Sequence, residues 1–187
     1  MIIWRFFIIG IIFLLNIGCS KKEEVSISDL ITLKGITYLK FLDQTEFNNK
    51  ELFTGIGIDR YNYNQKKIRT YYKNGKKHGE SLSWYPSGQL KEKGKYKKGK
   101  KIGKHKGFWP NGILRFEKIY LEGLLHGEQN QYHQNGIVSR LSNYKSGKEN
   151  GLQKGWRVNG DLKYNYQIIK NKRYGFMGSK VCVPVSF

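Results

Sequence analysis

The sequence predicts an all-β protein, an elongated antiparallel meander of 24-residue β-hairpin repeats. Three observations support this fold class. An aromatic and glycine pattern recurs at a constant interval, turn signals recur at the same interval, and side chains alternate with a period of two between the turns. Self-similarity at a fixed period is typical of repeat proteins, in which stacking buries a face that one repeat cannot bury alone.

The 24-residue period runs through six columns of equivalent positions. Tyrosine forms one column that ends at Ile168, glycine forms three, and the last two are apolar and aromatic. The columns are Tyr72, Tyr96, Tyr120 and Tyr144; Gly75, Gly99, Gly123 and Gly147; Gly55, Gly79, Gly103, Gly127, Gly151 and Gly175; Gly88, Gly112, Gly136 and Gly160; Leu90, Leu114, Val138 and Leu162; and Trp84, Phe108, Tyr132 and Trp156. The register does not slip over four units, so the interval is structural.

We expect each unit to contain two strands and two turns. The segments PSGQ, PNGI, QNGI and VNGD lie between extended runs. Asn-Gly predicts a type I′ hairpin turn there, with positive φ at both central residues. The other turn, Tyr-x-x-Gly-x-x-x-Gly, is longer and uses glycine for its backbone freedom. At about 4.8 Å per strand, each unit adds about 10 Å to the sheet, which would be on the order of 50 Å long.

Alternation within the first full unit predicts two unlike faces. We expect Leu82, Trp84, Leu90 and Tyr96 on one face, and Gln89, Lys91, Lys93 and Lys95 on the other. Stacked columns of aromatic side chains would then supply the cross-strand pairs that hold the sheet together.

The segment YKNGKKHG, followed by WYPSG, resembles the MORN repeat (membrane occupation and recognition nexus) in its bacterial variant. The resemblance covers residues 47–178 and implies a stacked-hairpin fold. It also implies a relation to bacterial lipoproteins and to proteins labelled antitoxins of toxin–antitoxin systems, in which this variant is common. Asn171 replaces an expected glycine, and YNYNQ at 61–65 lacks one, so the terminal units read as degenerate capping repeats.

Residues 1–18 have the pattern of a secretory signal peptide, with a single Arg5, an apolar run and Gly18 at the end. The Gly18-Cys19 junction resembles the lipobox of bacterial lipoproteins, which implies lipidation of Cys19. Asn16 departs from that motif, since an aliphatic residue commonly stands three positions before the cysteine. A plain signal peptide or an uncleaved anchor is the alternative, although the run is at the short limit for spanning a bilayer. We therefore expect a lipid-anchored protein of the bacterial cell envelope, at the outer membrane in a Gram-negative cell.

The rest of the chain divides into three parts. Residues 19–46 read as a lipidated tether, residues 47–178 as the repeat domain with five to six units, and residues 179–187 as a C-terminal tail. Lipidation of Cys19 would leave Cys182 as the one thiol, so no intramolecular disulfide is expected. Cys182 itself reads as a small hydrophobe on a terminal strand, and the protein is expected to be a monomer.

No local motif carries catalytic or metal-binding chemistry. His78 and His126 share a phase but lie two units apart, which is too far for both to bind one zinc ion. His105 and His133 fall in other columns, and all four read as turn or surface residues. The few acids after residue 60 are scattered over the repeat phases. The sequence therefore predicts a non-enzyme without cofactor or metal.

Positive charge gathers in the repeats. Residues 61–187 hold 27 lysines and arginines against 7 aspartates and glutamates. The densest cluster, opposed only by Glu92, comprises Lys91, Lys93, Lys95, Lys97, Lys98, Lys100, Lys101, Lys104 and Lys106. Such lysines either keep a flat sheet from pairing with another sheet or bind an anionic partner, and the sequence leaves both open.

Three functions fit these features. The first is a lipid-anchored scaffold that holds a basic, aromatic-bearing sheet against an acidic protein or an anionic membrane surface. The second, implied by the family resemblance, is an antitoxin or immunity-type protein that covers a toxin. The third is nucleic-acid binding, favoured by lysines interleaved with aromatic residues but disfavoured by export.

Overall fold

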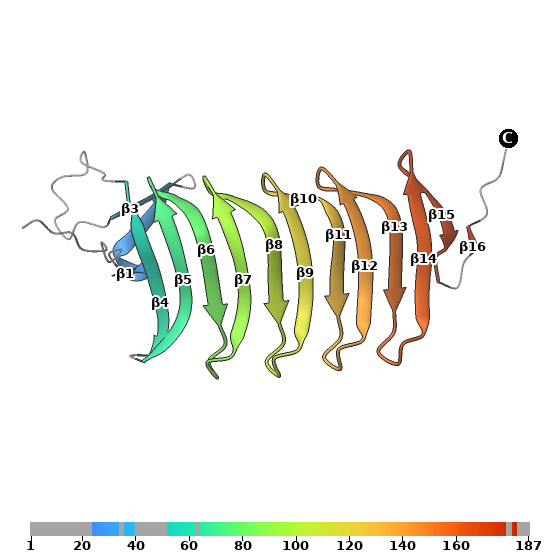
Figure 1. The fold of residues 1–187 in the computed structure, drawn as a ribbon, viewed down its shortest axis with the longest axis horizontal. Helices are drawn as coiled ribbons and strands as arrows, with labels where there is room; N and C mark the ends of the chain where they lie inside the picture. Colours follow the sequence, from blue (N-terminus) through green and yellow to red (C-terminus); the bar gives the residue numbers. More distant parts are fainter. Residues whose placement is uncertain (1–23, 34–35, 40–51, 63, 179–180, 183–187) are drawn as a thin grey trace, which may run out of the picture.

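The computed structural model describes residues 24–33, 36–39, 52–62, 64–178 and 181–182. Almost all of these residues belong to one open sheet of fourteen strands, in which strand order follows chain order (Figure 1). The described residues contain no α-helix. The predicted all-β meander of hairpin repeats is therefore confirmed.

The hairpins follow one another along the sheet, and their pairings are antiparallel. The strands are β4 (Gly55–Asn62), β5 (Gln65–Lys73), β6 (Lys76–Trp84), β7 (Leu90–Lys97), β8 (Lys100–Phe108), β9 (Leu114–Leu121), β10 (Leu124–Leu125), β11 (Gly127–Tyr132), β12 (Val138–Lys145), β13 (Lys148–Trp156), β14 (Leu162–Ile169), β15 (Lys172–Phe176) and β16 (Val181–Cys182). Cys182 thus lies on the terminal strand, as predicted.

Part of the predicted tether is folded onto the sheet. This region contains β1 (Glu24–Ser26), the 3₁₀ turn η1 (Ile27–Asp29), β2 (Leu30–Leu33) and β3 (Ile36–Leu39). β1 pairs in parallel with β4, and the Ile27 and Leu30 side chains lie over Gly57, where a Cβ would be 3.3 Å from each. The tether interpretation is wrong for residues 24–33 and 36–39, which are folded, and the Ile27 and Leu30 side chains cover a strand that no preceding repeat covers.

The two kinds of turn are the reverse of those predicted. In the Tyr-x-x-Gly turns both central residues have positive φ, as at Lys98 (50°) and Gly99 (84°), and these are the type I′ turns. Asn171 has φ 64° in the last of them, which asparagine tolerates, so its replacement of glycine is structurally neutral.

The turns that contain Ser-Gly or Asn-Gly have positive φ only at glycine. Gly88 N–H donates to the Tyr85 carbonyl (2.9 Å) and Tyr85 N–H to the Gln89 carbonyl (2.8 Å), which closes a three-residue loop. This geometry is a type I turn followed by a glycine bulge. Pro86 suits the first central position of this type I turn, but Gln134 and Val158 hold the same position in turns of the same geometry, so proline is compatible with the turn and does not by itself determine it.

The turns gather along the two long rims of the sheet (Figure 1). We call residues 73–76, 97–100, 121–124, 145–148 and 169–172 the type I′ rim, and residues 85–89, 109–113, 133–137 and 157–161 the opposite rim. Repeated hydrogen bonds join successive turns on each rim. On the type I′ rim, Gly99 N–H donates to Lys77 (2.8 Å), Gly123 N–H to Lys101 (2.9 Å) and Gly147 N–H to Leu125 (2.9 Å). On the opposite rim, Tyr85 donates to Phe108 (2.9 Å) and Trp109 to Tyr132 (3.1 Å), and His133 Nε2 lies 3.1 Å from the Trp156 carbonyl.

The sheet has a tyrosine face, which carries Tyr72, Tyr96, Tyr120 and Tyr144, and a lysine face, which carries Lys93, Lys95, Lys104 and Lys106. Leu82 is the cross-strand partner of Lys93, and directly paired residues share a face. The prediction that Leu82 lies on the face of Tyr96 is therefore wrong. A bulge between Ser83 and Trp84 resets the alternation, so parity cannot be counted through the turn.

A column of three buried hydrogen-bond donors on the tyrosine face holds successive hairpins together. His105, Gln129 and Gln153 occupy the same position in successive repeats and are at most 2% exposed. Their side-chain nitrogens bond to three carbonyls that are likewise equivalent in the repeat: Lys95 (2.9 Å), Ile119 (3.2 Å) and Asn143 (2.9 Å). The register of the ladder shifts beside these carbonyls in β7 and β12. The side chains therefore pair acceptors where the strand ladder is irregular.

His105 is buried, so its interpretation as a surface histidine is wrong. Its ring lies 5.5 Å from the Tyr96 ring and 4.9 Å from the Tyr120 ring, both edge-on. The ring occupies the space above Gly94, where a Cβ would overlap Nδ1. Since a carbonyl can only accept, Nε2 carries the proton in the bond to Lys95. Burial lowers the pKa of His105 below its ordinary 6.5.

Excision of one repeat should preserve the fold. Residues 96–119 span one full period, from Tyr96 to the residue before its equivalent, Tyr120. Their removal joins Lys95 to Tyr120 and should leave a shorter sheet with native strand order. Removal of residues 96–107 takes out half a unit and one turn, so the following strands would have to reverse direction and face. Circular dichroism and limited proteolysis should show a folded core only for the first deletion. Equal tolerance of both deletions would contradict the modular period.

Replacement of His105 by Gln should reduce the acid sensitivity of the protein. A depressed folded-state pKa means that protonation favours the unfolded chain, so the stabilisation by the neutral ring is present above pH 6.5 and lost as pH falls below it. Glutamine occupies this column at Gln129 and Gln153 and can make the same bond. Thermal unfolding between pH 7.5 and 5.5 should therefore show a smaller drop in Tm for His105→Gln than for the wild type. Parallel curves would exclude titration of His105 as the cause.

Candidate interaction surfaces

The nine candidate lysines do not form one patch but lie at several places on the sheet. Lys93, Lys95, Lys104 and Lys106 line the lysine face, and Lys97, Lys98 and Lys100 lie on the type I′ rim. Lys101 lies on the tyrosine face, with Nζ 5.1 Å from the centroid of the Tyr120 ring. Lys91 lies beside the opposite rim, with Nζ 5.5 Å from the Tyr85 centroid.

The four lysines of the lysine face come from β7 and β8. Lys93 and Lys106 are direct cross-strand partners, and together with Lys95, Lys104 and Glu80 they line a shallow depression of about 260 Å³. Like charges placed opposite each other on a sheet repel. This surface therefore has a local excess of positive charge that an anionic group would relieve.

Two glutamates moderate this charge, and neither is the one that the sequence indicates. Glu117 on β9 pairs with Lys104 (2.6 Å) and Lys106 (2.9 Å), and hydrogen bonds from these lysines lower the pKa of its carboxyl group. Glu80 is the cross-strand partner of Lys95. Within the described part of the chain, no carboxylate forms an ion pair with Lys93 or Lys95.

Glu92 does not oppose the lysine face. It is the cross-strand partner of Ser83 and Gly107, and its carboxylate lies 3.8 Å from Lys101 Nζ. Glu92 is the one acid within that stretch of sequence, but its side chain lies on the tyrosine face, away from these four lysines. Neighbours in sequence alternate between faces, whereas the acids beside the lysine face come from the adjacent strands β6 and β9.

The tyrosine face is packed tightly by rings that lie over glycines. A Cβ at Gly107 would overlap the Phe116 ring, and one at Gly155 would overlap the Tyr164 ring. Burial raises the pKa of the tyrosines in this column, Tyr72, Tyr96, Tyr120 and Tyr144. The phenols are therefore neutral at physiological pH and act as packing groups.

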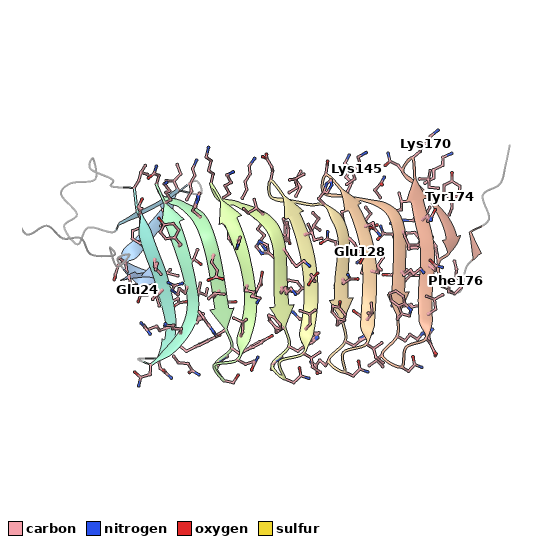
Figure 2. The ribbon with its side chains drawn as sticks, in the orientation of Figure 1. Glu24, Glu128, Lys145, Lys170, Tyr174 and Phe176 are labelled. Atoms are coloured by element: carbon pink, nitrogen blue, oxygen red, sulfur yellow. The ribbon has the colours of Figure 1, made fainter. Side chains whose placement is uncertain are left out.

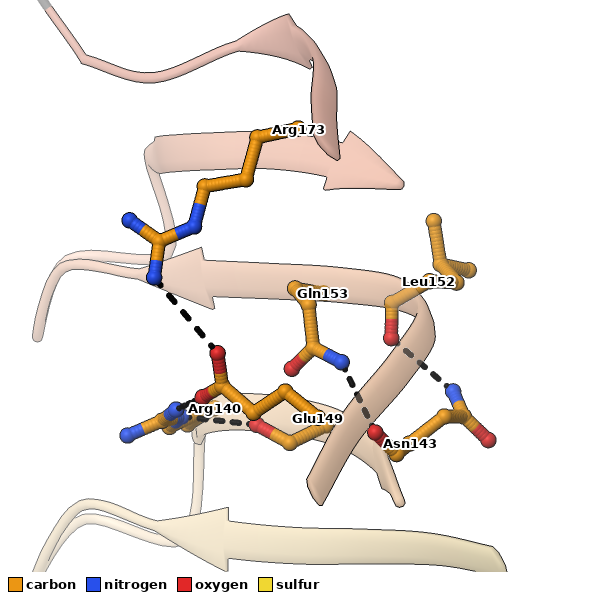
Figure 3. Close-up of polar contacts among 7 residues, drawn as sticks. Arg140, Asn143, Glu149, Leu152, Gln153 and Arg173 are labelled. Carbon is orange, nitrogen blue, oxygen red and sulfur yellow. Dashed lines mark hydrogen bonds and ion pairs between the residues drawn. The ribbon is translucent and has the colours of Figure 1, made fainter. Parts of the chain in front are cut away.

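Charged side chains on this face are also paired with one another. Figure 3 shows Glu149 between two arginines, with Oε1 2.5 Å from Arg140 Nη2 and Oε2 3.7 Å from Arg173 Nη2. Arg140 Nε also donates to Ser142 Oγ (2.7 Å). A cavity of about 240 Å³ lies beside Ser81, but Ser81 and Thr70 bond to each other across 2.7 Å. Much of the polar capacity of this face is thus used internally.

Cys19 and the signal segment 1–18 lie outside the described residues. Among the residues that the structure describes, no three histidine, cysteine or acidic side chains are grouped to hold a metal ion. None of the described segments is a helix long and apolar enough to cross a bilayer.

The profile of a known repeat family matches two segments of the chain. The family is described as the MORN repeat variant, and the matches cover residues 77–98 and 125–146. The second match begins two full periods of the register after the first. Each match runs through a turn of the opposite rim and ends within a type I′ turn. No curated protein matches the chain. The two matched segments are therefore MORN repeats of the variant type, and the hairpins between and beside them share their 24-residue register.

Proposed function

We propose that the chain is a non-enzymatic, lipid-anchored scaffold that presents its lysine face to an acidic protein partner. MORN repeats make the chain a repeat scaffold suited to protein or membrane interaction. The finer assignment rests on one observation: Lys93 and Lys95 stand beside Lys104 and Lys106 without ion-pair partners of their own among the described residues. A cluster of this kind favours an anionic partner through charge complementarity.

The sheet offers this partner a preorganised surface. Backbone ladders on both sides fix β7 and β8, so the four lysines are displayed on regular strands and not on mobile loops. Placing charges on a rigid scaffold reduces the ordering that binding requires. An antitoxin or immunity-type protein would use the same surface, with the toxin as its acidic partner.

The anchor in this proposal is Cys19, at the end of the apolar N-terminal run. Lipid attachment in the bacterial envelope would hold the sheet close to a membrane, at the outer membrane in a Gram-negative cell. A lipid anchor and a basic surface on the same chain would together favour retention at an anionic membrane.

Charge reversal on the lysine face should abolish binding to an acidic polypeptide. Lys93→Glu with Lys95→Glu should weaken binding to poly-L-glutamate strongly, and wild-type binding should fall as salt is added. The melting temperature should change little, because exposed charges contribute little to stability. The matched control is Lys66→Glu with Lys163→Glu, which makes the same charge change at exposed positions elsewhere on the sheet. Equal losses in both pairs would show that net charge, and not this surface, drives binding.

Replacement of the proposed lipidation residue should release the protein from membranes. In the native host, Cys19→Ser should shift the full chain from the detergent phase to the aqueous phase of a Triton X-114 partition. Cys182→Ser is the control and should leave the partition unchanged. Detergent partitioning that persists in Cys19→Ser would contradict lipid anchoring at this residue.

A further inference from the structure

The two rims of the sheet differ sharply in charge. The type I′ rim carries nine lysines, all exposed, against the single acid Glu122. These lysines are Lys73, Lys76, Lys97, Lys98, Lys100, Lys145, Lys148, Lys170 and Lys172. The four turns of the opposite rim contain no lysine, and their one arginine, Arg157, is matched by Asp161. Figure 2 shows Lys145 and Lys170 at the same end of the strands.

The type I′ rim is a continuous ridge. Hydrogen bonds from Gly99, Gly123 and Gly147, at 2.8–2.9 Å, tie the second, third and fourth turns to the residue that directly follows the preceding turn. Two strands separate successive turns, so the turns stand about 10 Å apart and the five of them span about 40 Å. The nine lysines are therefore held in a row and not on independent loops.

The middle turn of this ridge replaces lysine with leucine. The positions that flank the turn are Lys97 and Lys100 in one unit but Leu121 and Leu124 in the next. Leu121 is 58% exposed and Leu124 is 52% exposed. Leu124 leans over the following turn, with Cδ2 3.3 Å from where a Gly147 Cβ would stand, and this contact fixes its direction. Two half-exposed leucines thus stand at the centre of a row of lysines.

We propose that the type I′ rim rests on an anionic lipid bilayer, with its lysines at the headgroups and Leu121 and Leu124 in the acyl boundary. Basic residues beside exposed leucines are the composition of interfacial membrane contacts. Lysine attracts anionic lipid at about 1 kcal/mol per residue, while its aliphatic stem tolerates the interface. An acidic protein would complement the lysines but would not require exposed leucines among them. The extended row of turns also suits a surface broader than a binding pocket.

This arrangement would stand the sheet on its rim, with both faces directed away from the bilayer. The lysine face would then remain open to an acidic partner, so the rim is a second site and does not depend on the proposed function. The opposite rim also exposes apolar side chains, Ile137 at 37% and Val158 at 59%, but without flanking lysines. It therefore provides a matched control.

The test is co-sedimentation of residues 20–187 with vesicles of phosphatidylcholine, with and without phosphatidylserine. This chain keeps every residue that the structure describes and lacks the N-terminal apolar run. The charge variant of the rim is Lys97→Gln, Lys98→Asn and Lys100→Gln; asparagine suits position 98 because Asn74 holds the same positive φ in an equivalent turn. The apolar variant is Leu121→Ser with Leu124→Ser. Their controls are Lys93→Gln, Lys95→Gln and Lys104→Gln on the lysine face, and Ile137→Ser with Val158→Ser on the opposite rim. Thermal melting confirms that each variant is folded.

We expect the wild type to bind only the vesicles that contain phosphatidylserine. Loss of three rim lysines should weaken binding on the order of a hundredfold, and loss of the two leucines about tenfold. Both controls should bind like the wild type. The proposal is overturned if the wild type does not bind anionic vesicles, or if the rim variants lose no more than their controls. Loss in the lysine-face control alone would also overturn it, because it would place the membrane on that face. Poly-L-glutamate binding, measured in parallel, reports the proposed function separately.

Discussion

The bond between a buried side-chain donor and a carbonyl beside each β-bulge is the interaction on which the repeat depends. His105, Gln129 and Gln153 reach the carbonyls of Lys95, Ile119 and Asn143, each at the same separation along the chain. A thin open sheet has few places where a polar backbone group can be buried, and an unpaired one costs about 1–3 kcal/mol. The donors pair these carbonyls where the register of the ladder shifts, so the irregularity forms without that cost. A histidine serves as well as a glutamine, because the site requires an N–H at that position and not a particular residue.

The 24-residue period made the architecture predictable, because one hairpin cannot bury its own face and successive hairpins must therefore stack. The turns were not predictable from Asn-Gly alone. Asn-Gly or Ser-Gly fits a two-residue loop or a three-residue loop with a glycine bulge, and all four turns adopt the three-residue loop, with proline before the pair in two of them and without it in the other two. The N-terminal cap was missed for another reason: residues 24–33 and 36–39 belong to no repeat, so the 24-residue period does not reveal that Ile27 and Leu30 pack on the first hairpin.

The candidate surface was predicted in composition but not in arrangement. Alternation along β7 correctly separates Lys93 and Lys95 from Tyr96. It does not show that Glu117, from the next hairpin, neutralises part of the cluster, or that Lys101 lies on the other face. Both facts depend on cross-strand register, which bulges change by one residue at a time. The donor column was also missed, because its members differ in type and only their shared phase in the repeat reveals them.

Because the repeats stack in register, residues at the same position of successive repeats form a row along the sheet. Lysine on both sides of three type I′ turns, together with Lys172 in the last one, forms a basic ridge, while glycine, asparagine and proline at the other turn leave the opposite rim nearly neutral. A departure in one unit is equally localised, so Leu121 and Leu124 interrupt the ridge at its middle. The sheet therefore separates its possible contacts by geometry: a polar lysine face, a tyrosine face closed by its own packing, and a basic rim with an apolar centre. Each surface can be altered by substitutions at one phase of the repeat without disturbing the buried column that holds the hairpins together.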